Sequence, residues 1–215
     1  MSTTRSQLSD HVDPTLRVVP PLENGDCLSR DEFERRYEAM PEVHQAELID
    51  GVVYMPSPIY LPHADSHAAI VTWLGMYAAQ TPGVQCLACG SIRIDDKNEV
   101  QPDAYLRLLT GGKSTTDAEK YVVGAPELVA EVASSSVSRD MHQKLRLYER
   151  IGVREYLVWR VLDREIDWYQ LEAGRFQPLV SGDDGIVRSR VFPGLWLDRA
   201  AMPRWQCGHR AGAFG

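Results

Sequence analysis

The chain has 215 residues, of which 44% are hydrophobic, and its formal net charge is −7. This length and apolar content suffice for one buried core, and no apolar run approaches the ~18 residues that a membrane-spanning helix needs. The acidic balance argues against a surface coated for nonspecific nucleic-acid binding, because neutralising phosphates requires clustered Lys and Arg.

Four cysteines are too few for a disulfide framework and favour free thiols in a reducing compartment. The first residues also lack the apolar segment of a signal peptide. We therefore expect a cytoplasmic protein with no membrane segment.

The sequence divides into an arm, one domain and a tail. Residues 1–27 carry prolines and polar side chains without a sustained period, which predicts an extended or disordered arm. Residues 28–192 hold the predicted helices and strands, and residues 193–215 predict an aromatic, loop-like tail.

The domain opens with a predicted helix and a predicted hairpin. Ser29 followed by Glu32 forms a capping box, and the apolar period after it predicts a helix that ends at Pro41. The dipeptide Asp50-Gly51 between two short apolar runs predicts a β-hairpin with a type I′ turn.

A second helix is predicted over residues 67–80, with Asp65 or Ser66 as its cap. Neighbouring strands are predicted over residues 84–95 and 101–109, separated by the polar turn "DDKNE". A loop is expected to follow them.

The strand predicted over residues 125–133 is mostly apolar on both faces, which indicates a central position in the sheet. A third helix is predicted over residues 138–152, capped by Ser138 and closed by Gly152. Three further strands are predicted over residues 154–162, 165–171 and 174–180. This order predicts an α/β (α+β) fold in which helices flank a mixed β-sheet.

Two charged residues lie where apolar ones are expected. At ~100° per residue, Lys144 falls in the middle of the third helix's apolar face and Asp140 lies inside it, whereas Arg139 falls on the solvent side. Strand alternation places Glu131 deep in the preceding strand. An Asp140–Lys144 pair with a snorkelling lysine, and a Glu131 that caps the helix or pairs with an arginine, would explain each charge separately.

A second carboxylate stands at the start of another predicted strand, where Asp103 follows Pro102. Alone, Asp103 reads as a turn or strand-cap residue. Two carboxylates can hold a hard divalent ion while a lysine orients or deprotonates a water. We therefore interpret Asp103, Glu131 and Lys144 as one cation-dependent site.

The order Pro102-Asp103, Glu131 and a lysine resembles the PD-(D/E)xK nuclease superfamily, which has the restriction-endonuclease-like fold. Within it, several segments are similar to the Uma-two family of endonucleases, over roughly residues 29–180. These segments are "ELIDGVVYMPSP", "QPDAYL", "APELVAEVASSSVSRD", "KLRLYERIGVREYLVW" and "REIDWY".

The resemblance implies a metal-dependent endonuclease that hydrolyses phosphodiester bonds, with DNA as the expected substrate. It implies Mg²⁺, which Mn²⁺ can replace, held by Asp103, Glu131 and the backbone carbonyl of Val132. Glu47 corresponds to the family's upstream acidic position and would extend the metal shell. Asp140 would hold the ammonium of Lys144 in place.

One departure separates this chain from the superfamily pattern. The superfamily's lysine normally lies two residues after the glutamate, where this chain has Ala133, and we interpret Lys144 as its relocated equivalent. His67 stands where the family often has a histidine, so it is either a substrate contact or an ordinary histidine at a helix start.

Other interpretations stay open at this point. A noncatalytic module that keeps the fold and binds nucleic acid or protein would explain the missing in-line lysine. Aromatic residues of the later strands are expected in the core or at a dimer interface, although they could stack bases, and the exposed strand edges favour a homodimer. These aromatic residues are Trp159, Trp168 and Tyr169. A zinc site is a weaker alternative, with Cys86, Cys89, Cys207 and His209 as ligands.

Overall fold

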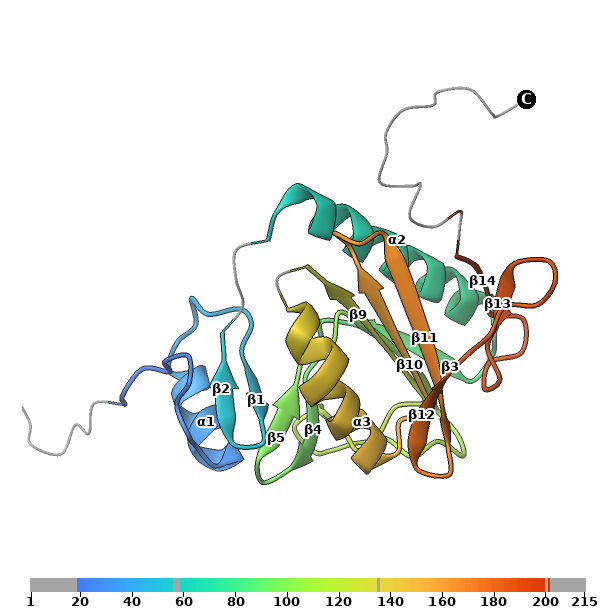
Figure 1. The fold of residues 1–215 in the computed structure, drawn as a ribbon. Coiled ribbons are helices and arrows are strands. Elements are labelled where there is room, and N and C mark those ends of the chain that lie inside the picture. The colour runs from blue at the N-terminus through green and yellow to red at the C-terminus, as the bar shows by residue number, and fades with distance from the viewer. Residues whose placement is uncertain (1–18, 56–58, 135, 200, 202–215) are drawn as a thin grey trace, which may run out of the picture.

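The structure, a computed structural model, describes residues 19–55, 59–134, 136–199 and 201. Its helices are α1 (Arg30–Glu38), α2 (Leu61–Gln80) and the π-helical turn η1 (Arg139–Lys144), which continues as α3 (Leu145–Ile151). Figure 1 shows α2 and α3 on either side of a twisted sheet, with α1 and a hairpin beside it. Across the described ranges, no helix combines the length and the apolar content that crossing a membrane requires.

The strands form two six-stranded sheets and a separate pair. The first sheet has the order β2 (Val52–Tyr54), β1 (Glu47–Ile49), β5 (Asn98–Val100), β4 (Ile92–Asp95), β8 (Val122–Val123) and β7 (Thr115–Thr116). The second has the order β12 (Arg175–Pro178), β11 (Glu165–Glu172), β10 (Glu155–Arg160), β9 (Leu128–Ala133), β6 (Ala104–Leu108) and β3 (Val84–Ala88). The pair is β13 (Ile186–Arg188) with β14 (Trp196–Asp198).

The second sheet is mixed and carries the core. β9 runs parallel to β10, whereas the pairs β10–β11 and β6–β9 are antiparallel. β9 is buried along its whole length and has neighbours on both sides. The predicted mixed sheet, its flanking helices and the central position of this strand are therefore confirmed.

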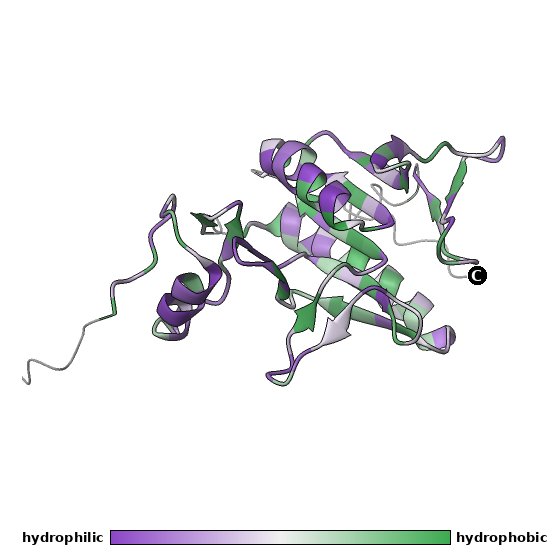
Figure 2. Cartoon of the chain, turned by 90° about the horizontal axis from the view of Figure 1, so that it is seen from below, coloured by the Kyte–Doolittle hydropathy of each residue, from purple (hydrophilic) through white to green (hydrophobic). Residues whose placement is uncertain are grey.

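The two faces of β9 belong to different layers, because side chains alternate along a strand. Leu128 and Ala130 pack in the cluster that contains Ile70 of α2. Val129 packs in the cluster that contains Leu147 of α3. Figure 2 shows hydrophobic residues along these strands and mostly hydrophilic ones on α1. The carboxyl end of β9 thus lies between two helical layers.

The first helix and hairpin follow their local signals. The Ser29 hydroxyl accepts a hydrogen bond from the Glu32 backbone N–H at 3.4 Å, as the capping box predicts. Asp50 and Gly51 both have positive φ, 50° and 79°, which the type I′ turn between β1 and β2 requires. The Ser29 cap and the hairpin turn are confirmed, whereas the Glu32 carboxylate accepts from Arg35 and Arg36 and the helix ends at Glu38, before Pro41.

The second helix begins earlier than predicted. Its N-cap is Tyr60, and Pro62 stands in the first turn, where a missing N–H costs nothing. Ser66 lies inside the helix and donates its hydroxyl to the Pro62 carbonyl at 2.8 Å. The predicted cap at Asp65 or Ser66 was wrong, because the helix already starts at Leu61 and the Ser66 hydroxyl bonds within it.

The strand predicted over residues 84–95 is two strands in different sheets, β3 and β4. The chain turns between them at Cys89, whose φ is 53°. At Gly90, an added Cβ would lie 2.9 Å from the hydroxyl of the buried Tyr105, so a larger residue there would have to displace that side chain. Gly90 and Ser91, between the two apolar runs, are the local signal of this break.

The third helix also differs at its start. It already includes Val137, and Ser138 has helical angles, φ −63° and ψ −40°, with no side-chain cap. The predicted Ser138 cap was therefore wrong. At the other end, Gly152 has φ 83° and closes the helix by donating to the carbonyls of Tyr148 and Glu149, as predicted.

The packed part of the chain extends beyond the predicted boundaries at residues 27 and 192. Leu195 and Leu197 lie in the predicted tail, yet both are buried in the cluster that contains α2. Leu22 of the predicted arm is buried with Phe33 of α1. Residues 1–18 and 202–215 lie outside the described residues. Trp159 and Trp168 are buried, which confirms the core interpretation for these two aromatics.

The Leu197→Ala variant should lower the free energy of unfolding by about 2–5 kcal/mol, because it leaves a cavity under α2. Urea denaturation of both proteins measures the difference. Val180→Ala, at a position that is 81% exposed, is the matched control and should change stability by less than about 0.5 kcal/mol. Equal effects of the two variants would contradict the packing of the predicted tail.

An ionic network joins α1 to the first sheet. Nε of Arg93, on β4, lies 2.8 Å from Oε1 of Glu34, on α1, and its Nη1 lies 2.8 Å from Oδ2 of Asp117 and donates to Glu119. Glu99 of β5 is buried beside this network. Burial, together with the neighbouring Glu34 carboxyl, raises the pKa of Glu99 to about 8.

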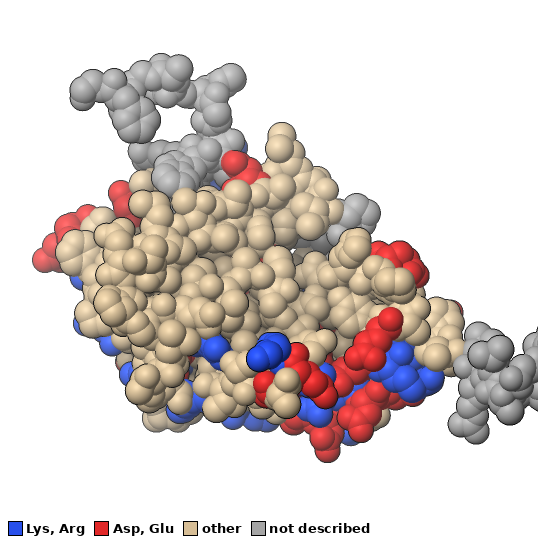
Figure 3. Space-filling view, turned by 180° about the vertical axis from the view of Figure 1, so that it is seen from behind, with Lys and Arg blue, Asp and Glu red and all other residues tan. Residues whose placement is uncertain are grey.

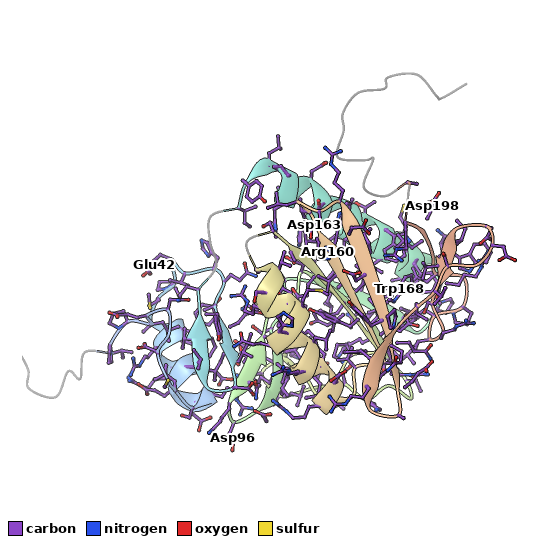
Figure 4. The ribbon with its side chains drawn as sticks, viewed as in Figure 1. Glu42, Asp96, Arg160, Asp163, Trp168 and Asp198 are labelled. Carbon is purple, nitrogen blue, oxygen red and sulfur yellow. The ribbon has the colours of Figure 1, made fainter. Side chains whose placement is uncertain are left out.

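Glu99 should make the protein less stable as pH rises. The unfolded carboxyl loses its proton near pH ~4.3, whereas the folded one keeps it to about pH 8. Between these values the folded state binds more protons, so the stabilisation is complete at the acid end and is lost as pH approaches 8. Urea unfolding at about pH 5 and about pH 8 measures the effect. Between these two pH values the free energy of unfolding should fall less for Glu99→Gln than for wild type. The exposed Glu42 (Figure 4) gives the control, Glu42→Gln, and equal declines in all three would count against this assignment.

Candidate functional site

The site begins where the pairing between β6 and β9 ends. The last pair in the ladder is Ala104 with Ala130, so Val132 lies beyond it. The Val132 backbone N–H donates instead to Oδ2 of Asp103, at 2.7 Å. Pro102, just before Asp103, has no N–H with which to extend the ladder. Asp103 is thereby attached to the carboxyl end of β9, and the Val132 carbonyl points to the same edge as its N–H.

The two charges singled out in the sequence are in direct contact. Nζ of Lys144 donates to Oε1 of Glu131 at 2.9 Å and lies 2.8 Å from Oε1 of Glu47 and 3.8 Å from Oδ1 of Asp140. The Tyr148 hydroxyl donates to the same Glu131 oxygen at 3.0 Å. Lys144 is 3% exposed, so its side chain does not snorkel to solvent.

The flanking carboxylates are held by separate elements. Oε1 of Glu47, on β1, accepts the Gln101 backbone N–H at 3.0 Å. Oδ2 of Asp140 accepts a hydrogen bond from the Ser136 hydroxyl, and the Tyr156 hydroxyl donates to the Asp140 carbonyl at 3.0 Å. Oδ1 of Asp140 is buried and has no hydrogen-bond partner among the described residues. The site therefore collects carboxyl groups from both sheets and from the helix.

The electrostatics keep the lysine charged. Burial raises the pKa of Glu131 well above its ordinary value, although Lys144 opposes the shift, and burial also raises the pKa of Asp140. Burial alone would lower the pKa of Lys144, but the carboxylates of Glu131 and Glu47 outweigh it and raise that pKa. Lys144 is thus an ammonium ion at neutral pH.

These groups line a cavity of about 160 Å³. The predicted residues Asp103, Glu131, Val132, Glu47, Asp140 and Lys144 all belong to its lining. The wall also includes His63, Ser134, Ser136 and Arg139. Carboxyl groups outnumber cationic side chains in this lining, which favours binding of a cation.

His67 lies next to the site without lining the cavity. Its Nε2 is 3.2 Å from the Asp103 carbonyl and 3.5 Å from Sγ of Cys89. These contacts hold the backbone of Asp103 and favour a positioning role for His67 over direct substrate contact.

His63 is a site residue that the sequence analysis missed. Its Nδ1 lies 3.4 Å from the Ser134 hydroxyl and its Nε2 lies 3.9 Å from Oδ1 of Asp103. His63 precedes His67 by one turn of α2, and their rings stack at 6.4 Å. Because the predicted helix started after residue 64, this i, i+4 pair went unnoticed; proline in the first turn was the available signal.

The donor set suits a hard divalent ion bound by few protein ligands. No described residue donates a hydrogen bond to Oδ1 of Asp103 or Oε2 of Glu131, so both oxygens are available. Within the described ranges, no three His, Cys, Asp or Glu side chains converge as a ready metal cage. Mg²⁺ commonly binds one or two carboxylates and keeps several waters. A site made of Asp103, Glu131 and the Val132 carbonyl fits this coordination preference.

The cysteines do not assemble a zinc site within the described chain. Cys86 packs against the core beneath α2, and Cys89 lies beside His67. Cys207 and His209, the other two ligands of that alternative, lie outside the described residues.

The mixed sheet, with Asp103 before β6 and Glu131 on the neighbouring β9, is the restriction-endonuclease-like arrangement expected from the sequence, although the lysine stands on the following helix instead of two residues after the glutamate. Residues 30–200 match the Uma2 family, described as "Putative restriction endonuclease", and the chain belongs to this family. The resemblance seen in the sequence is confirmed, and the chain stands among nuclease-like proteins.

A solved structure has a similar fold. It is the crystal structure of "a putative nuclease belonging to DUF820" from Anabaena variabilis, with a TM-score of 0.63 and 13% sequence identity. The alignment covers 80% of this chain and 97% of that chain. None of the curated proteins matches this chain.

The Lys144→Met variant should lower the free energy of unfolding by about 3–5 kcal/mol, because it leaves two buried carboxylates without their cation. Adding Glu131→Gln should restore part of this loss, since one of the two charges is then removed. Urea denaturation measures both, with Lys97→Met at an exposed position as the control. If Lys144 and Glu131 are not coupled, the costs of the two substitutions add. The double variant would then be less stable than Lys144→Met by the whole cost of Glu131→Gln.

Proposed function

We propose that this protein is a metal-dependent endonuclease that hydrolyses phosphodiester bonds of DNA, with Mg²⁺ as its cofactor and Mn²⁺ able to replace it. The main support is the convergence of Lys144 from the helix on Glu131, at 2.9 Å, in one cavity with Asp103. The lysine thereby reaches the glutamate from a different backbone position than in the superfamily pattern.

In this proposal Asp103, Glu131 and the Val132 carbonyl hold the ion. The bound ion would polarise a phosphoryl oxygen and lower the pKa of a water that attacks in line. Asp103 is preorganised for this role because Oδ2 is occupied by the Val132 N–H, which leaves Oδ1 directed elsewhere. Glu131 is similarly anchored through Oε1 by Lys144 and Tyr148.

Lys144 acts as a cation rather than as a base in this proposal. The carboxylates around it raise its pKa, so it carries a proton that it does not readily release. It would orient the attacking water and offset negative charge that develops on the phosphate. Glu47 and Asp140 keep the ammonium in place, and Glu47 serves in this way instead of as a third metal ligand.

The distribution of charge favours local recognition of the nucleic acid. Figure 3 shows Lys and Arg interspersed with Asp and Glu along one edge, and few charged side chains over the middle of that face. That face offers no basic coat for a phosphate backbone, in keeping with the net charge of −7. The homodimer expected from the sequence stays a prediction, and such a dimer would contain two candidate active sites.

A noncatalytic binding module is the second candidate. The observation that favours it is the position of the Lys144 ammonium between Glu47 and Glu131, where it already neutralises part of the acidic charge. Such a module would bind nucleic acid or protein without binding a divalent ion. Metal binding therefore distinguishes the two candidates.

The Asp103→Asn variant should abolish cleavage, with a loss of at least about a hundredfold, because it removes a metal-binding charge while keeping a hydrogen-bond acceptor for Val132. Supercoiled plasmid DNA and a structured RNA are incubated with Mg²⁺ or Mn²⁺, and nicking is followed on gels. Asp183→Asn, at an exposed position distant in sequence from the site, is the matched control.

Calorimetric titration with Mn²⁺ supplies an independent readout. Wild type and Asp183→Asn should bind Mn²⁺, and Asp103→Asn should bind it at least about tenfold more weakly. Failure of the wild type to bind Mn²⁺ or Mg²⁺ would exclude the nuclease and favour the binding module. Cleavage of RNA but not DNA would correct the substrate alone.

A further inference from the structure

Arg139 faces the candidate site although a regular helix would direct it to solvent. In an α-helix, residues three and four apart share a face, which separates Arg139 from Lys144. These residues span the π-helical turn η1, where hydrogen bonds join residues five apart. The wider turn therefore brings Arg139 above Lys144, and both line the same cavity.

The guanidinium of Arg139 has unused hydrogen-bonding capacity. Nε is buried without a hydrogen-bond partner, and Arg139 forms no hydrogen bond or ion pair with another described residue. Its charge lies over the Tyr54 ring, with Cζ 5.2 Å from the ring centroid, which holds the side chain beside the cavity.

Arg160 provides a contrast at the same end of the second sheet. It is opposite Ala133 in the β9–β10 ladder and lies near Asp163 at the β10–β11 turn (Figure 4). Arg160 is paired with two carboxylates, since it donates to Asp163 and to Oδ2 of Asp167 at 2.7 Å. Arg139, by comparison, lines an acid-rich cavity with a buried Nε that has no acceptor among the described residues, so a bound phosphate could supply one.

We propose that Arg139 binds a nonbridging oxygen of the nucleic-acid phosphate at the mouth of this cavity. This inference rests on the proposed function and names the residue that recognises the substrate's backbone. A guanidinium presents paired N–H donors that match a phosphate, and it stays charged at any relevant pH. A phosphate would otherwise meet the repulsion of the surrounding carboxylates, which the positive charge of Arg139 offsets.

Binding of a phosphate by Arg139 would affect the affinity for nucleic acid and not the sequence specificity. Phosphate contacts set the register of a nucleic acid but carry no sequence information. Arg139 therefore contributes equally to substrates of any sequence, and a change at this position leaves sequence preference as it was.

The Arg139→Ala variant should weaken binding of a fluorescently labelled DNA duplex about tenfold, measured by anisotropy with Ca²⁺ in place of Mg²⁺. It should also lower the slope of log Kd against log salt by about 0.7–0.9, since one phosphate contact is lost. In cleavage assays KM should rise while kcat changes by less than about threefold. Arg139→Lys should restore the salt slope but only part of the affinity, because lysine keeps the positive charge and lacks the paired N–H donors of the guanidinium.

Arg146→Ala is the matched control, because Arg146 lies on the same helix in an exposed position outside the cavity lining. It should leave the affinity and the salt slope as in wild type. An Arg139→Ala protein with wild-type slope and affinity would overturn the inference while leaving nuclease activity intact. A wild type that does not bind nucleic acid would overturn it too. A wild type that binds nucleic acid but fails to cleave would refute the proposed function alone, and the lowered slope would still support Arg139.

Discussion

The ammonium of Lys144 between the carboxylates of Glu131 and Glu47 is the interaction on which the site depends. Each partner comes from a different layer: the helix, the second sheet and the first sheet. Taking three charges out of water is costly, and only close contact among them offsets that cost. The contact at 2.8 Å and 2.9 Å therefore does more than pair charges, because it sets how the two sheets and the helix meet.

A second constraint arises from the end of the β6–β9 ladder. Pro102 cannot extend the pairing, so the N–H of Val132 finds its acceptor in the side chain of Asp103. A backbone requirement thereby orients a functional carboxylate. The same strand end leaves the Val132 carbonyl beside it, which is why a strand terminus supplies both charged and neutral oxygens to one place.

Sequence patterns predicted the parts of the site that depend on regular periods. Alternation along the strand placed Glu131 inside, and helical spacing placed Lys144 on the apolar face. Asp103 became a candidate only in combination with Glu131 and Lys144, because an aspartate after a proline is common in turns. Two site residues depend on less regular features: His63 follows from a helix start marked by Pro62, a signal that the sequence contains, whereas Arg139 faces the cavity through the π turn, which has no period of its own.

In the fold, too, regular elements were predictable from the sequence and irregular ones were not. The mixed second sheet was predictable because its strands are long enough to display a period. The first sheet was not predicted as a separate layer, since β7 and β8 have two residues each and carry no pattern. The change of sheet at Cys89 and the packing of Leu197 depend on contacts between residues distant in the chain, which local patterns do not encode.

The π-helical turn has a further effect, on tolerance to changes in length. Its residues are followed by a regular segment in which Leu147 and Tyr148 are buried and Gly152 closes the helix. Removing one residue between Asp140 and Lys144 would restore α-helical hydrogen bonding and leave Arg139 four residues and Asp140 three residues before the lysine. Both spacings keep side chains on one face of an α-helix, so Arg139 and Asp140 would stay at the cavity while the hydrophobic packing persisted. The turn thus accommodates one additional residue without changing which side chains face the cavity, and a deletion there would leave both the fold and the arrangement of the site in place.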